Sequence, residues 1–130
     1  MNGINIDFTK DNYYPAISQR EFKLIHQKVN KQIRFKLDTI NRNLIEHKEL
    51  DIKLYSKMIY KALYNNYIIL PSITKDKPNY YNFIAKLDNI YYVSLVLDTD
   101  PKKEYFEIVH VLKTKRNGIR KVIRKIKKIK

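Results

Sequence analysis

The chain has 130 residues, of which 44% are hydrophobic and 31% charged, a composition typical of one globular domain rather than of a disordered segment. Its 27 Lys and Arg residues outnumber 13 Asp and Glu residues, and the net charge of +14 favours a polyanionic partner, nucleic acid and RNA first. The absence of cysteine excludes disulfides, a thiol nucleophile and cysteine-ligated zinc.

Several other classes of protein are disfavoured by the sequence. Residues 1–15 lack a basic start followed by an apolar run, and no apolar stretch approaches the ~18 residues that a membrane span requires. We therefore expect no secretory signal, no membrane span and a cytoplasmic location, in the producing or the target cell. Only Gly3 and Gly118 are glycines, so a Gly-rich phosphate loop cannot form, and no motif predicts a metal site or a cofactor.

Residues 1–48 are predicted to be an N-terminal helical extension that begins with a lead-in over residues 1–17. Ser18 is a candidate N-cap, and Glu21 completes a capping-box pattern three residues later. Apolar residues then recur every three or four positions without an interrupting Pro or Gly, which predicts one long helix or two shorter ones. This stripe consists of Phe22, Ile25, Val29, Ile33, Leu37, Ile40 and Leu44.

A second helix is predicted to start near Glu49–Asp51 and to end around Asn65–Asn66, because Leu50, Leu54, Met58 and Ala62 repeat at helical spacing. The run Tyr67–Leu70, closed by Pro71, predicts a short strand or an extended linker. Residues 72–79 are polar and contain a second proline, as expected of a loop.

From residue 81 onward the pattern predicts strands, in residues 81–87, 90–98 and 105–113. These segments are rich in Tyr, Val, Ile and Phe, and Asp88-Asn89 suits a tight turn between the first two. Helices followed by an antiparallel β-meander give an α+β fold, with residues 49–118 as its core.

The last part of the chain is predicted to be a basic tail helix over residues 119–130. Residues 113–130 hold ten Lys and Arg and no acid, which leaves 17 basic against 13 acidic residues, a net charge of +4, elsewhere. Isoleucine and valine recur at helical spacing among these bases. We expect RNA to contact Tyr91 and the bases Lys113, Lys115, Arg120, Lys121 and Arg124.

Strand pairing predicts a cluster of polar side chains on one sheet face. With a two-residue turn at Asp88-Asn89, Lys86 pairs with Tyr91, and with Asp98 paired to Tyr105, Val93 pairs with His110. Lys86, Tyr91, His110 and Thr114 then share a face. A histidine supplies acid–base chemistry near neutral pH, and a lysine stabilises charge on a phosphate.

Each of these residues also has a structural interpretation. A strand histidine is commonly a packing residue, Lys86 beside a turn is commonly solvated, and a slip of one residue in the third strand reverses its faces. His26 and His47 have no partner at the spacing of a metal site.

The segments FIAKLDNIYYVSLVLD and YFEIVHVLKTKRNG, following helices, resemble the barnase/EndoU/colicin/RelE-like nucleases, and most closely their phage- and toxin-associated branches. The resemblance spans about residues 50–118. It implies a metal-independent endoribonuclease that cleaves by attack of the 2′-hydroxyl, with His110, Lys86, Thr114 and Arg116 at the scissile phosphate. It also implies a toxin that is neutralised by a dedicated partner, such as an acidic immunity or antitoxin protein.

Two other hypotheses stay open at this stage. The chain could be a non-catalytic nucleic-acid-binding protein of a mobile element, using its basic tail and exposed tyrosines. It could also dock on a membrane or a protein through the tail helix, although the tail lacks Trp and Phe.

Overall fold

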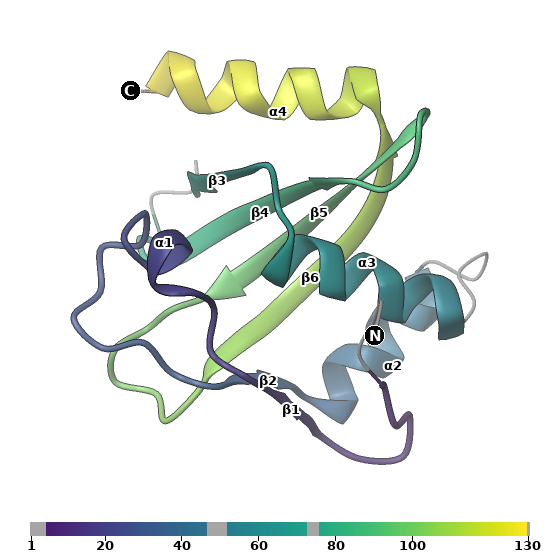
Figure 1. Ribbon diagram of the computed structural model, residues 1–130, viewed down its shortest axis with the longest axis vertical. Coiled ribbons are helices and arrows are strands. Elements are labelled where there is room, and N and C mark those ends of the chain that lie inside the picture. Colours follow the sequence, from purple (N-terminus) through teal and green to yellow (C-terminus); the bar gives the residue numbers. More distant parts are fainter. Residues whose placement is uncertain (1–4, 47–51, 73–75, 130) are drawn as a thin grey trace.

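The computed structural model describes residues 5–46, 52–72 and 76–129, which form a mixed α+β fold around one six-stranded sheet (Figure 1). The predicted α+β class is confirmed. In chain order the elements are β1 (Asn12–Tyr14), α1 (Gln19–Phe22), β2 (Ile33–Phe35), α2 (Leu37–Glu46), α3 (Ile52–Tyr64), β3 (Ile68–Pro71), β4 (Tyr80–Lys86), β5 (Tyr91–Asp98), β6 (Phe106–Lys115) and α4 (Arg116–Ile129).

The strand order across the sheet is β1-β2-β6-β5-β4-β3. Strands β4, β5 and β6 form the predicted antiparallel meander, and β3 extends it beyond β4. The pairing of β2 with β6 is parallel, whereas the other strand pairs are antiparallel. The N-terminal strands therefore join the same sheet as the meander.

The inner face of the sheet carries the main hydrophobic core. Phe83, Leu95 and Val111 point to this face from the three meander strands and are fully buried. Helix α3 packs on β4, β5 and β6 and contributes the buried side chains of Tyr55 and Met58. As predicted, α3 is an amphipathic helix, and its apolar stripe completes the core.

The outer face of the sheet is covered by α4 at one end. Ile68, Ile84, Ser94 and Leu112 are register partners in one row across β3, β4, β5 and β6. Because α3 occupies the opposite face, the burial of Ile84 and Ser94 must come from another element, and α4 contacts β3, β5 and β6. Ile119 of α4 is also buried and lies outside the main core cluster. A second, smaller apolar layer therefore holds α4 on the sheet (Figure 1).

Of the two predictions for the region after Ser18, one long helix is wrong: two shorter helices, α1 and α2, are separated by strand β2, and the start of the first was placed correctly. The Ser18 side chain accepts a hydrogen bond from the Glu21 amide at 3.3 Å, as in a capping box. Helix α1 nevertheless ends at Phe22, and the His26 amide then donates to the Tyr81 hydroxyl at 2.9 Å. Val29, which the helical stripe would bury, is 61% exposed.

Residues 33–35 form a strand because tertiary partners favour extended backbone there. Ile33 and Phe35 alternate with Arg34 and are both fully buried, which is a period of two rather than of 3.6. Helix α2 starts only at Leu37, whose amide donates to the Asp11 carboxylate at 2.7 Å. Residues 1–48 are therefore not a purely helical extension, since they supply two strands to the sheet.

Candidate nucleic-acid interface

The hairpin between β4 and β5 differs from the predicted two-residue turn. Lys86 pairs with Tyr92 instead of Tyr91. The Asp88 carboxylate accepts hydrogen bonds from the amides of Ile90 and Tyr91 at 2.7 and 2.8 Å, so the loop spans three residues. These backbone donors, with Lys57 and Lys113 nearby, lower the pKa of Asp88 below its ordinary value. Tyr91 consequently lies on the inner face, away from Lys86.

The register between β5 and β6 also differs from the prediction. His110 pairs with Val96 instead of Val93, and a bulge at Val109 shifts the strand by one residue before Leu97 meets Ile108. The first pairing differs from the prediction by one residue and the second by three. Because each odd shift reverses the predicted face, the two reversals cancel, and Lys86 and His110 still share a face. Lys86, His110 and Thr114 share one face, as predicted, and it is the outer face. Tyr91, which was predicted to share it, lies on the inner face.

The shared face does not bring the proposed catalytic residues into one site. Lys86, Tyr92 and Thr114 form a row across β4, β5 and β6. His110 is four residues from Thr114 along β6, which is about 13 Å at ~3.3 Å per residue. A group that transfers a proton must come within about 3 Å of the reacting atom, so His110 cannot act on a phosphate held beside Thr114 in this geometry.

Thr114 lies under the first turn of α4. A methyl group on Gly118 would overlap the Thr114 hydroxyl oxygen, so the absence of a side chain at Gly118 allows the close approach of helix and strand. Arg116, the first residue of α4, is exposed at this corner together with Lys115. Thr114 therefore supports the helix, and Lys115 and Arg116 present charge to solvent.

Helix α4 presents a cationic surface opposite its buried side. Arg120, Lys121 and Arg124 are exposed, while Ile119 is buried and Ile123 is half-buried. The helix contains no acidic residue, so no carboxylate within it neutralises these charges. Because the apolar side is packed on the sheet, these cations are carried by a docked helix rather than by a free tail.

A contact between two tyrosines near the first turn of α4 was not predicted from the sequence. The rings of Tyr67 and Tyr92 lie 6.3 Å apart between centroids and are tilted by 57°. Tyr67 is 61% exposed, and Tyr92, on the outer face, is half-buried. Alternation along β5 could have placed Tyr92 on this face, but the contact with Tyr67, 25 positions away in the chain, depends on the path of β3 beside β4.

Tyr91, the predicted contact residue, instead has a local partner. The Lys113 ammonium group lies 4.6 Å from the centre of the Tyr91 ring, a cation–π contact on the inner face. Lys113 and Tyr91 are therefore half-buried against each other at the same corner of the sheet.

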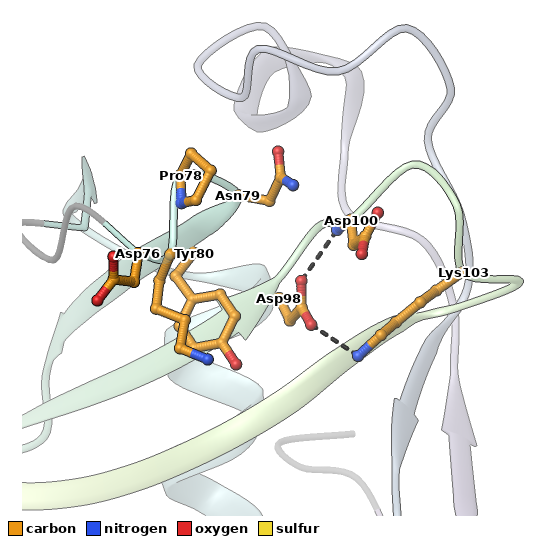
Figure 2. A pocket seen from close by; sticks show the side chains of 8 residues that line it. Asp76, Pro78, Asn79, Tyr80, Asp98, Asp100 and Lys103 are labelled. Carbon is orange, nitrogen blue, oxygen red and sulfur yellow. Dashed lines mark hydrogen bonds and ion pairs between the residues drawn. The ribbon is translucent and has the colours of Figure 1, made fainter.

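At the opposite end of the meander a polar cavity of about 260 Å³ opens (Figure 2). Its carboxylates come from Asp76, Asp98 and Asp100, and Lys103 donates to Asp98 at 2.8 Å. The Asp98 carboxylate also accepts from the Asp100 amide at 3.0 Å, so both of its oxygens have partners. Across residues 5–46, 52–72 and 76–129, no group of three His, Asp or Glu side chains is arranged to hold a metal ion.

His26 does not lie on the sheet face that carries His110. It is exposed on the loop after α1 and lines a cavity of about 280 Å³ with Lys28, Lys31 and Pro101. The nearest aromatic partner is Tyr81, whose ring centre is 6.5 Å from that of His26. Tyr81 is on the inner face, so His26 does not supply a second histidine to the outer face.

Fold and charge define a small α+β domain that carries a cationic helix on one face of its sheet. The chain belongs to the family described as large polyvalent protein-associated domain 13, whose model matches residues 4–126. This membership points to a polyvalent or toxin-associated protein, in agreement with the phage- and toxin-associated setting expected from the resemblance.

The family match does not show the barnase/EndoU/colicin/RelE-like nuclease family that the sequence resembles. Comparison with curated proteins and with solved structures finds no match to this chain. Among the helices that the structure describes, none is long and apolar enough to cross a membrane.

Proposed function

We propose that this domain binds RNA through the exposed basic surface of α4, without itself being a nuclease. The observation that carries the proposal is the placement of Arg120, Lys121 and Arg124 on the solvent side of a helix whose other side is packed on the sheet. Several cations on one surface neutralise several phosphates and release the counterions condensed on a nucleic acid, which favours a polyanion over a small ligand.

The proposal is tested by the salt dependence of binding. In a variant with Arg120→Gln, Lys121→Gln and Arg124→Gln, we expect much weaker binding of a single-stranded RNA oligonucleotide. The slope of log K against log salt should fall by about 2, because each lost phosphate contact contributes ~0.7. Fluorescence anisotropy at a series of salt concentrations measures both quantities.

A matched control has the same change in net charge at exposed lysines away from α4. Lys23→Gln, Lys28→Gln and Lys102→Gln remove three charges from loops at the other end of the sheet. This control should retain the wild-type slope. Equal losses in the two triple variants would mean that net charge alone attracts RNA, and the assignment of the interface to α4 would be wrong.

A second candidate function is the metal-independent endoribonuclease implied by the sequence resemblance. It is supported by the common outer face of Lys86, His110 and Thr114, although the separation of His110 from Thr114 argues against one compact site. Cleavage of total RNA in EDTA that is lost in His110→Ala at unchanged thermal stability would establish this function. Salt-sensitive binding without cleavage supports the first proposal instead.

The proposed interface also suggests where regulation would act. An acidic antitoxin or immunity protein that covers α4 would compete with RNA for the same cations. Both partners fit a cytoplasmic location, which we propose for the producing or the target cell.

A further inference from the structure

Beside α4 the sheet exposes aromatic side chains, which binding of phosphates by basic residues does not require. Tyr67 is 61% exposed although its ring contacts Tyr92 at 6.3 Å, and Ile90 at the tip of the adjacent hairpin is 58% exposed. Large apolar side chains that stay in solvent together commonly mark a binding surface.

We propose that Tyr67 and Tyr92 stack unpaired bases, so that the ligand of this interface is single-stranded nucleic acid. This inference rests on the proposed binding function of α4 and adds what the bound strand must look like. A flat ring accepts any base on its π-face, whereas the bases of a duplex are already stacked and cannot reach it.

The position of the pair relative to α4 supports this proposal. Tyr92 is the register partner of Thr114 on one side and of Lys86 on the other. Because Thr114 lies directly under Gly118, Tyr92 is next to the first turn of α4. A strand whose phosphate contacts the exposed Arg116 at the start of α4 therefore has its bases near Tyr92.

A second tyrosine pair differs from Tyr67 and Tyr92 in the charges that lie beside it. Tyr13 and Tyr105 have ring centres 5.0 Å apart and a tilt of 54°, and Tyr13 is 50% exposed. Their neighbour Arg34 lies over the Tyr105 ring at 5.2 Å and is paired with the carboxylate of Glu107. Lys36 is paired with the same carboxylate at 3.5 Å, so the cations beside this tyrosine pair are partly neutralised.

By contrast, exposed cations lie in and beside the row that contains Tyr92. Lys86 is exposed in this row, and Arg116 is exposed where β6 meets α4. The nearby carboxylate of Asp88 is occupied by two backbone amides. Among the described tyrosine pairs, this one therefore combines an exposed ring with uncompensated positive charge, as single-strand binding requires.

The experiment compares two ligands that have the same phosphates. One is a 2′-O-methyl oligouridylate, which cannot be cleaved through its 2′-hydroxyl, and the other is an abasic oligonucleotide of equal length. Wild-type protein should bind the oligouridylate about 5- to 150-fold more tightly, the range expected for one stacked base at about 1–3 kcal/mol.

Substitutions then assign the effect to the two rings. Tyr67→Leu and Tyr92→Leu should each reduce the preference for the oligouridylate while leaving the affinity for the abasic strand unchanged. Tyr67→Phe and Tyr92→Phe should keep the preference, because phenylalanine retains the ring. Tyr13→Leu is the matched control, since it removes an exposed tyrosine from a second tilted tyrosine pair, at the other end of the sheet.

The outcomes separate this inference from the proposed function on which it rests. If wild-type protein binds both strands equally and the triple Gln variant of α4 binds neither, α4 binds phosphates but the tyrosines do not stack bases. If wild-type protein binds neither strand, the proposed function itself is wrong. If Tyr13→Leu lowers the preference as much as Tyr67→Leu, the wrong pair has been assigned.

Discussion

At the scale of single residues, the outer face of the sheet buries two carboxylates side by side. Asp98 and Glu107 are register partners on β5 and β6, and they are only 5% and 8% exposed. Lys103 pairs with Asp98, while Arg34 and Lys36 both pair with Glu107. Two neighbouring buried carboxylates repel each other, and these cations offset the repulsion.

Lys103→Gln is expected to lower the free energy of unfolding by about 1 kcal/mol at neutral pH. Asp98 would lose a charged partner but keep the Asp100 amide, and the Lys103 side chain is 43% exposed, so solvent screening keeps the effect small. Urea unfolding of the variant and of wild-type protein measures this difference.

The contribution of Lys103 to the free energy of unfolding should also decrease at high pH. The hydrogen bond to Asp98 raises the pKa of Lys103 above its ordinary value of 10.5. The contribution is therefore fully present below pH 10.5 and is lost as the pH rises through the folded-state pKa. A difference between wild type and Lys103→Gln that grows with increasing pH would contradict this assignment.

At the scale of elements, the docking of α4 depends on one glycine. Helix interiors normally disfavour glycine by about 1 kcal/mol relative to alanine. Gly118 is nevertheless two residues inside α4, where its missing side chain leaves room for the Thr114 hydroxyl. The Thr114 Cβ and Cγ2 atoms would lie 3.5 and 3.8 Å from an added methyl group, which is ordinary contact.

The effect of Gly118→Ala should therefore change sign with the residue at position 114. In wild-type protein we expect a loss of about 1 kcal/mol, because the overlap with the hydroxyl outweighs the gain in helix propensity. In a Thr114→Ala background the same substitution should stabilise by about 1 kcal/mol. Thermal unfolding of the four proteins in a double-mutant cycle gives the coupling, and additive effects would show that Thr114 rotates away without cost.

At the scale of the whole molecule, the N-terminal third is part of the fold. It supplies β1 and β2, and β2 lies between β1 and the long strand β6 (Figure 1). Its buried apolar side chains enter the same core as those of α3 and the meander. They are Tyr14, Ile17, Ile25, Ile33 and Phe35.

Deletion of residues 1–36 is expected to abolish cooperative folding. Five buried side chains at roughly 1.5–3 kcal/mol each add up to about 10 kcal/mol, comparable with the ~5–15 kcal/mol that stabilise a whole domain. Circular dichroism of the 37–130 fragment during heating is the measurement. A sharp melting transition in that fragment would mean that the N-terminal residues are a separable extension after all.

The sequence by itself determined the features that depend on neighbouring residues. The alternation of Tyr, Val and Ile predicted the meander, and the stripe around Leu54 and Met58 predicted α3. The N-cap at Ser18 was also correct, since its hydroxyl accepts from the Glu21 amide and donates to the Glu21 carboxylate, three positions away. Local periodicity and local hydrogen bonding are sufficient for such elements.

Tertiary structure decided what the same local patterns left ambiguous. The apolar residues Ile25, Val29 and Ile33 fit a helix, but Ile33 became a strand residue because β6 offered a parallel partner, which no spacing reveals. The register of His110 depended on the bulge at Val109, and the meeting of Tyr67 with Tyr92 depended on β3 reaching β4. Strand pairing joins residues far apart in the chain, so its partners and register follow from the packing of the whole sheet.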